Sequence, residues 1–147
     1  MIALITVAML TLNPLMEAEP AEPVAQTEAT LSSAQDSRSE SAALAWLALA
    51  DAGEWEESWD AAADMFQSEV TAAQWAAAAS DVRSPLGEVV SREVLAIQQT
   101  ADLPGVPEGD YTVIQFATAF AASPSSVETV IMRAEDGDLK TVGYFIR

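Results

Sequence analysis

Few side chains in this sequence have the chemistry that catalysis usually needs. The 147 residues include no histidine and no cysteine, which excludes disulfides, thiolate chemistry and the usual zinc ligand sets. Acid–base chemistry would therefore need a carboxylate, a tyrosine or the single lysine, Lys140, with a strongly shifted pKa. The spacing of the acidic residues matches no calcium-binding loop, so we predict neither a metal site nor a cofactor.

Two charged residues interrupt apolar, strand-like runs. Arg92 lies in VVSREVLAI and Glu128 lies in SSVETVIM. Because a buried charge needs a partner, one interpretation is a polar pair at the mouth of a pocket. The other, which we favour, is a structural ion pair or two exposed edge positions. A third charge, Arg83, ends a predicted helix and is expected to hydrogen-bond the free carbonyls there.

Three of the four tryptophans fall within WLALADAGEWEESWD, residues 46–60. Trp55 and Trp59 are spaced i, i+4 and so lie on one face of a helix. Such a stripe is more often core than binding site, and large rings fill the volume that many alanines leave. If aromatic rings instead line a pocket, the candidate ligand-binding side chains are Trp59, Trp75, Tyr111, Phe116, Glu128 and Tyr144.

The charge balance limits the possible partners. Six basic and 23 acidic residues give a formal net charge of -17. Such a surface repels the phosphates of nucleic acids and anionic lipid headgroups. We therefore expect no nucleic-acid partner and a strongly solvated, self-repelling surface.

The N-terminal residues predict an export signal followed by a linker. The apolar run IALITVAMLTL is too short to span a bilayer, which needs about 20 apolar residues, but its length is typical of a signal peptide. We predict a signal peptide at residues 1–18, hence a periplasmic or secreted protein with no stable membrane span. Residues 19–40 are rich in Ala, Glu, Pro and Ser and predict a disordered linker. The folded domain is then 41–147.

Three helices are expected at the start of this domain. The first covers residues 41–52 and ends at Gly53, where a left-handed residue is favoured. The third starts at a capping box, Thr71 to Gln74, and ends before Pro85. The expected apolar stripes are Leu44, Leu47 and Ala48 in the first helix, Trp55, Trp59, Ala62 and Phe66 in the second, and Trp75, Ala79, Val82 and Leu86 in the third.

Four strand-like segments follow the helices, at residues 88–100, 110–122, 126–135 and 139–147. Turn signals separate them, including DLPGVPEGD and the Asp-Gly pair of EDGD. The order predicts an α+β fold with three N-terminal helices on a curved, four-stranded antiparallel meander sheet, cone-like in shape. Both strand faces carry apolar groups, so we expect helices on the concave face and a partner or dimer on the other. In the first strand, Val90, Val94 and Ala96 are expected to face one side, and Val89, Leu95 and Ile97 the other.

The motifs together resemble a known family. The ordered series WLALADAGEWEESWDAAADMF, QW, VRSPLGEVVSRE, LPGVPEGDYTVIQFATAF, VETV and VGYFIR is similar to the bacterial exported family called domain of unknown function 4019. The similarity covers roughly residues 42–147, with one departure at Leu139, where an aromatic is expected near the last hairpin. It implies a small α+β fold of the nuclear transport factor 2-like cone type, export to the bacterial envelope, and no assigned activity.

Three functional hypotheses remain open from the sequence. The preferred one is a non-enzymatic envelope module that binds a protein partner or forms a homodimer. The second is a carrier of a small apolar ligand, with a pocket between helices and sheet. The third is an enzyme, because related cones can pair a carboxylate base with a tyrosine that stabilises an enolate. Asp60 or Asp64 with Tyr144 would serve, although the two aspartates read more simply as a solvated acidic face.

Overall fold

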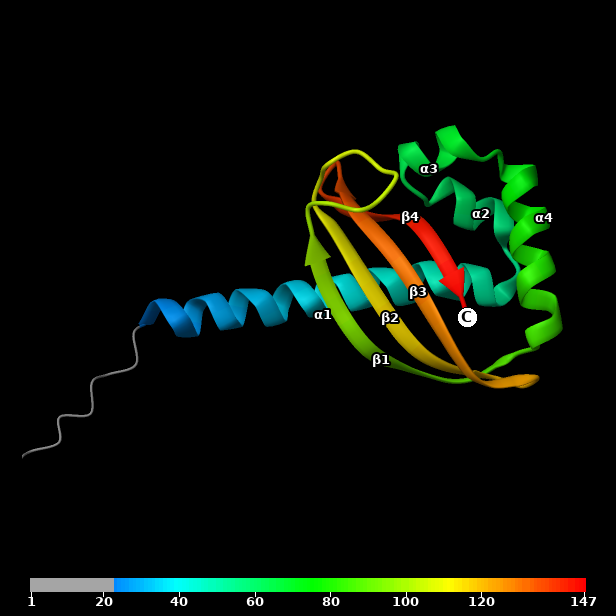
Figure 1. Ribbon diagram of the computed structural model, residues 1–147, viewed down its shortest axis with the longest axis horizontal. Coiled ribbons are helices and arrows are strands. Elements are labelled where there is room, and N and C mark those ends of the chain that lie inside the picture. The colour runs from blue at the N-terminus through cyan, green and yellow to red at the C-terminus, as the bar shows by residue number, and fades with distance from the viewer. Residues whose placement is uncertain (1–22) are drawn as a thin grey trace, which may run out of the picture.

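The computed structural model describes residues 23–147, so the predicted signal peptide and the first residues of the predicted linker lie outside it. Helices come first and strands follow, as the sequence predicts for an α+β fold (Figure 1). The elements are α1 (Pro23–Ala52), α2 (Trp55–Asp60), α3 (Asp64–Glu69), α4 (Ala72–Arg83), the short 3-10 helix η1 (Ser84–Leu86), β1 (Val89–Thr100), β2 (Tyr111–Phe120), β3 (Ser123–Glu135) and β4 (Asp138–Ile146).

Helix α1 is longer than the sequence suggested. It begins at Pro23, a residue whose fixed backbone angle suits the first helical position, so the described part of the expected linker is helical. Its N-terminal part extends away from the sheet in Figure 1. Polar contacts hold the following turns against the sheet: the Gln35 side chain donates to Gln99 at 3.0 Å, and Arg38 donates to the carbonyl of Gly137. These contacts join residues that are far apart in the sequence, so the amino-acid composition of the segment does not reveal them. They are found where a helix forms in a segment rich in polar residues.

The buried face of α1 is rotated slightly from the expected one. Leu44 is 39% exposed and Ala48 is exposed, whereas Trp46 and Leu47 are buried. The four buried apolar residues follow the i, i+3, i+4, i+7 spacing of a single helix face, and they are Ala43, Trp46, Leu47 and Ala50.

The second predicted helix is wrong in one respect, because it is broken into α2 and α3. Ala62, expected on its apolar stripe, instead forms a β-bridge with Thr141 of β4, and the Ala63 amide donates to the Thr141 carbonyl at 2.9 Å. The break frees carbonyls at the end of α2, and the Gln67 amide donates to those of Trp59, Asp60 and Ala62. Pairing with β4 and this internal cap replace the helical hydrogen bonds.

Helix α4 begins as predicted and buries a different last residue. Its capping box is present, and in it the Thr71 hydroxyl accepts a hydrogen bond from the backbone N–H of Gln74. Val82, expected in the core, is 51% exposed. The residue after it, Arg83, is 7% exposed and lies on the same face as Trp75 and Ala79. The apolar stripe of α4 therefore ends in a buried charge.

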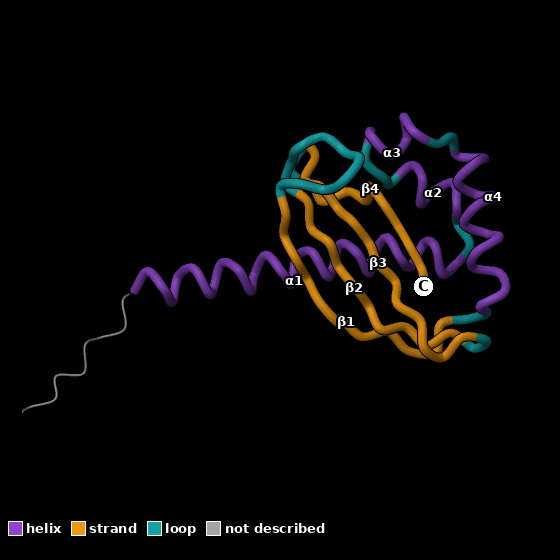
Figure 2. Tube along the Cα trace, in the orientation of Figure 1, coloured by secondary structure: helices purple, strands orange, loops and turns teal. Residues whose placement is uncertain are grey.

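The strands form one antiparallel sheet in the order β1-β2-β3-β4, which confirms the predicted meander. The Asp-Gly turn between β3 and β4 places both Asp136 and Gly137 at positive φ, 54° and 86°, as a two-residue hairpin requires. Figure 2 shows the strands curving along their length, with the 101–110 loop folded over one end.

Strand β1 departs from the expected alternation. Its pairing with β2 shifts between Val89 and Ser91 and again between Val94 and Ala96. Each shift is a bulge, which adds a residue and flips the side chains that follow to the other face. Val94 therefore lies opposite Phe116 while Ala96 lies opposite Gln115, on different faces of the sheet.

The molecule has two layers. Helix α1 crosses one face of the sheet, which we call the inner face, and α2 to α4 gather beside β4 (Figure 1). The opposite face, which we call the outer face, carries no helix over its middle in the described part of the chain. The core lies between α1, α4 and the inner face, where the buried strand residues are Ile114, Phe116, Val130 and Met132. Among residues 23–147, no helix is both long and apolar enough to cross a membrane.

Candidate functional site

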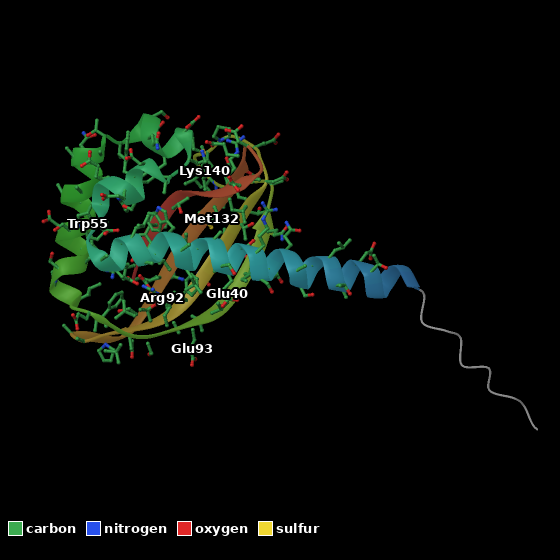
Figure 3. The ribbon with its side chains drawn as sticks, turned by 180° about the vertical axis from the view of Figure 1, so that it is seen from behind. Glu40, Trp55, Arg92, Glu93, Met132 and Lys140 are labelled. Carbon is green, nitrogen blue, oxygen red and sulfur yellow. The ribbon has the colours of Figure 1, made fainter. Side chains whose placement is uncertain are left out.

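Four charged side chains meet beneath the C-terminal end of α1. Asp51 comes from α1, Arg83 from α4, Arg92 from β1 and Glu128 from β3. Each arginine contacts both carboxylates: Arg83 lies 2.7 Å from Asp51 and 3.4 Å from Glu128, and Arg92 lies 2.8 Å from Asp51 and 2.7 Å from Glu128. We call this closed ring of two positive and two negative charges the charge network. It joins both layers, and Figure 3 shows Arg92 on the α1 side of the sheet.

Glu128 is the centre of the charge network. Its side chain is 0% exposed and accepts four hydrogen bonds. Oε1 accepts from Arg83 and from the Tyr144 hydroxyl, and Oε2 accepts from Arg92 and from the Thr118 hydroxyl at 2.6 Å. The expected structural ion pair between Arg92 and Glu128 is confirmed. A hydrogen-bond donor thus occupies every acceptor position of this carboxylate. This is the arrangement of a group that stabilises the structure.

The outer carboxylate of the network, Asp51, is held ionised. Burial acts to raise the pKa of Asp51, but hydrogen bonds from Arg92 and Arg83 outweigh it and lower the pKa below its ordinary value of 3.8. Burial likewise acts to lower the pKa of Arg92, and its bonds to Asp51 and Glu128 reverse this and raise it. Neither group is prepared to exchange a proton near neutrality, as a general acid or base would be.

Tyr144 closes the network on the β4 side. Its hydroxyl donates to Glu128 and accepts from Arg83 at 2.9 Å. Burial raises the pKa of Tyr144 well above its ordinary value of 10.0, and the negative charge of Glu128 raises it further against the opposing effect of Arg83. The phenol is therefore fixed in its neutral, hydrogen-bond-donating form.

We expect Tyr144 to ionise only as the domain unfolds in alkali. Because its folded pKa lies above the unfolded value of 10.0, its contribution to stability is complete below that pH and is lost as the pH rises beyond it. Phenolate absorbance and circular dichroism, followed through the same titration, should change together, and Tyr144→Phe should remove this component. Ionisation of Tyr144 at unchanged circular dichroism would contradict the assignment.

The tryptophans pack against one another and against Tyr144. The Trp75 ring centroid lies 5.9 Å from that of Trp46, 5.1 Å from Phe66 and 6.4 Å from Tyr144. Three of the four indole N–H groups donate inside the protein, since Trp46 and Trp75 both donate to Ser58 and Trp59 donates to the Val70 carbonyl. These contacts are those of a filled core.

The structure brings only some of the six candidate ligand-binding residues together. Trp75, Phe116, Glu128 and Tyr144 lie between the helices and the inner face. Trp59 packs at the edge of this core.

Tyr111 lies on the outer face instead, opposite Arg133, whose guanidinium is 5.8 Å from its ring. Its hydroxyl donates to the Pro107 carbonyl at 2.6 Å and contacts Met65 of α3. The 101–110 loop and α3 thus bury Tyr111 on the far side of the sheet, and it cannot share a pocket with the other five.

The aspartates considered for catalysis do not approach Tyr144. Asp60 and Asp64 are exposed at the ends of α2 and α3, which agrees with a solvated acidic face. The carboxylate that contacts Tyr144 is Glu128. No group of three or more acidic residues in the described chain is arranged to hold a metal ion.

Surface pockets lie at the periphery of the fold. Five pockets formed by residues 34–141 have volumes from ≈ 340 to ≈ 580 Å³. Of the six candidates, Tyr111 lines one of these five, beside Gln35 and Gln99. The largest lies beside Asp51, Trp55 and Arg83, at the open side of the charge network.

Two members of the charge network, Asp51 and Arg83, and the Thr118 hydroxyl bound to it were not expected from the sequence. Asp51 and Thr118 carried no signal, because a helix-end aspartate and a strand threonine are common on surfaces. Arg83 was interpreted as a helix-end cap, which is wrong, since its guanidinium binds Asp51 and Glu128. A usable signal was its rarity: the chain has six basic residues among 147, and Arg83 follows the i, i+4, i+8 face of Trp75 and Ala79.

A family model described as "Protein of unknown function (DUF4019)" matches residues 42–144. The matched span includes all four tryptophans, every member of the charge network and the sheet up to Tyr144 of β4. No curated protein and no solved structure matches the chain. The family match covers well over half of the sequence, and the chain belongs to the DUF4019 family.

Proposed function

We propose that this protein is a non-enzymatic interaction module of the bacterial envelope, which binds a protein or a second copy of itself through the outer face. One observation carries this proposal: no helix of the described chain covers the middle of the outer face, where apolar side chains stand among uncharged polar ones. Phe145, on β4, is 60% exposed there. Uncovered apolar surface marks interaction sites in soluble proteins.

The outer face is built from rows of side chains that run across all four strands. Residues directly opposite one another on neighbouring strands point to the same side. The three central rows are Gln98, Val113, Ile131 and Gly143; Ala96, Gln115, Thr129 and Phe145; and Glu93, Ala117, Val127 and Arg147. A side chain at Gly143 would meet both Phe145 and Ile131, at 3.3 and 3.6 Å. The glycine thus leaves room for the Phe145 ring to lie flat over the sheet.

Charge is nearly absent from this surface. The chain has a net charge of -17, yet the central rows contain one acidic residue, Glu93, and one basic residue, Arg147, both at the edges. The self-repelling charge therefore lies elsewhere on the protein. A partner can approach the outer face without the desolvation of many carboxylates.

The geometry gives less support to the two alternatives. A carrier needs an open apolar pocket, but Trp75 and Tyr144, two of the residues expected to line it, pack against each other, and Trp75 also packs against Trp46 and Phe66. An isomerase-like enzyme needs a carboxylate free to accept a proton, but both oxygens of Glu128 accept two hydrogen bonds each.

The proposal also covers the location of the protein and its finer fold type. The apolar run at residues 2–12 supports export, although these residues lie outside the described part of the chain. Helices on the concave side of a curved sheet are consistent with the nuclear transport factor 2-like cone type. We include both in the proposal.

A photo-crosslinking residue in place of Phe145 tests the proposed function in the organism that makes the protein. Because Phe145 is exposed in the middle row of the proposed site, on the edge strand β4, we expect illumination to give a discrete higher-mass adduct. The matched control is the same substitution at Ala77, which is exposed on α4, and it should give none. Equal labelling from both positions, or no adduct from position 145, would exclude the outer face as a binding site.

A further inference from the structure

The two charges of the outer face lie at opposite ends of one row. Glu93 on β1 pairs with Ala117, and Ala117 pairs with Val127. Val127 then exchanges two backbone hydrogen bonds with Arg147, at 2.7 and 3.1 Å. Both charged side chains are exposed, and Figure 3 shows Glu93 pointing away from α1. A negative and a positive group thus stand at the same height on the two edges of the sheet.

This arrangement is complementary to itself. When two identical sheets stack face to face about a two-fold axis that runs along the strands, β1 of one copy lies over β4 of the other. Residues of one row then remain level with one another, so each Glu93 comes opposite the partner's Arg147. The alternative two-fold axis, perpendicular to the strands, would place β1 over β1 and β4 over β4, so that no Glu93 lies opposite an Arg147.

We infer that the occupant of the outer face is a second copy of this chain, stacked about a two-fold axis along the strands with two Glu93–Arg147 pairs across the interface. This inference rests on the proposed function and names the partner for it. The apolar side chains of the central rows fill the space between the sheets, about 10 Å apart. The two Glu93–Arg147 pairs across the interface determine which edge of one sheet lies opposite which edge of the other.

The size of the face indicates how tight the dimer is. Four strands about 4.8 Å apart and three rows about 7 Å apart give a face of about 400 Å² in projection. Two such faces give about 800 Å², which is below the roughly 1,200 to 2,000 Å² of stable specific interfaces and corresponds to a weak, transient dimer. We therefore expect a dissociation constant in the range of about 1 to 100 μM.

Sedimentation equilibrium on the full chain tests the inference. The variants are Glu93→Arg, Arg147→Glu and the double charge swap. A matched control, Asp81→Arg, makes the same charge change as Glu93→Arg on exposed α4. We expect dimers for the native chain and about tenfold weaker association for each single reversal, because each places like charges together at two symmetric sites. The double swap should restore the native constant to within about threefold, and the control should stay within about threefold of it.

The outcomes separate this inference from the proposed function. A native chain that is monomeric throughout, single reversals without effect, or a double swap as weak as the singles would each overturn the second copy as occupant. If an adduct of a different mass still forms from position 145, the outer face binds another protein and the proposed function stands. If no adduct forms there, both fail. Circular dichroism of every variant checks that the domain is folded.

Discussion

Replacing Glu128 by Gln is expected to lower the free energy of unfolding by about 3 to 5 kcal/mol, the cost typical of breaking a buried ion pair from one side. The substitution keeps the shape of the side chain and removes one of two negative charges that face Arg83 and Arg92. The charges of Asp51, Arg83 and Arg92 stay the same. A net positive charge then remains in a site where Glu128 itself is 0% exposed.

The amide cannot replace the carboxylate by rotating. Each oxygen of Glu128 accepts one arginine and one hydroxyl, Arg83 and Tyr144 on Oε1, Arg92 and Thr118 on Oε2. Whichever side the amide nitrogen takes, its N–H groups face an arginine, which cannot accept a hydrogen bond. Since a domain of this size is stable by about 5 to 15 kcal/mol, the loss is a large share of the total.

Urea unfolding followed by tryptophan fluorescence measures this effect. The matched control is Glu69→Gln, because Glu69 is exposed at the end of α3, and it should change stability by less than about 0.5 kcal/mol. A loss below about 1 kcal/mol for Glu128→Gln would mean that water already reaches the network and screens it.

Local signals in the sequence were sufficient for the element boundaries they govern. The capping box at Thr71 and the left-handed Gly53 act through neighbours within four residues, and both are present as predicted. The same holds for the Asp136–Gly137 hairpin turn. The order of elements and the antiparallel meander followed from these turns and from the strand patterns.

The break between α2 and α3 could not be predicted in this way. Nothing in the sequence DAAADMF stops a helix, since alanine is the best helix former. The helix ends because Ala62 and Ala63 bind Thr141, a residue about eighty positions later in the chain. Tertiary contact outweighs local propensity here.

The charge network, too, could be predicted only in part from the sequence, because it depends on tertiary contacts. Arg92 and Glu128 stood out because they interrupt apolar runs, and an ion pair was one of the arrangements considered for them. The bulges of β1 then determine which face of the sheet Arg92 occupies. No turn residue in the sequence indicates that these bulges are present. Asp51 joins the network because α1 ends above β1, so its role depends on packing rather than on its neighbours in sequence.

The second large expected effect concerns Trp75. Truncation to alanine should lower the free energy of unfolding by about 3 to 5 kcal/mol, as for other buried tryptophans. Trp75 is 8% exposed, and its ring contacts those of Trp46, Phe66 and Tyr144. The rings around it are anchored by hydrogen bonds, so they cannot move inward to fill the space.

The matched control, Trp75→Phe, keeps an aromatic ring and removes the N–H that Ser58 accepts. It should lose about 1 to 2 kcal/mol, since one hydrogen bond and part of the ring volume are gone. Urea unfolding by circular dichroism reports both variants without depending on the tryptophan that was removed. The difference between the losses in unfolding free energy of the two variants separates the contribution of ring volume from that of the hydrogen bond.

This pair of variants also decides whether the aromatic rings packed around Trp75 belong to a filled core or to a pocket. A ring that lines an open pocket loses little stability when truncated, because water or ligand already occupies one side of it. A ring in a filled core leaves a cavity, and the cost rises with the volume that cannot be refilled. A loss below about 1.5 kcal/mol for Trp75→Ala would therefore favour the carrier hypothesis over the interaction module. A loss near the expected range assigns these rings to the core, whose rigidity holds the sheet and its outer face in shape.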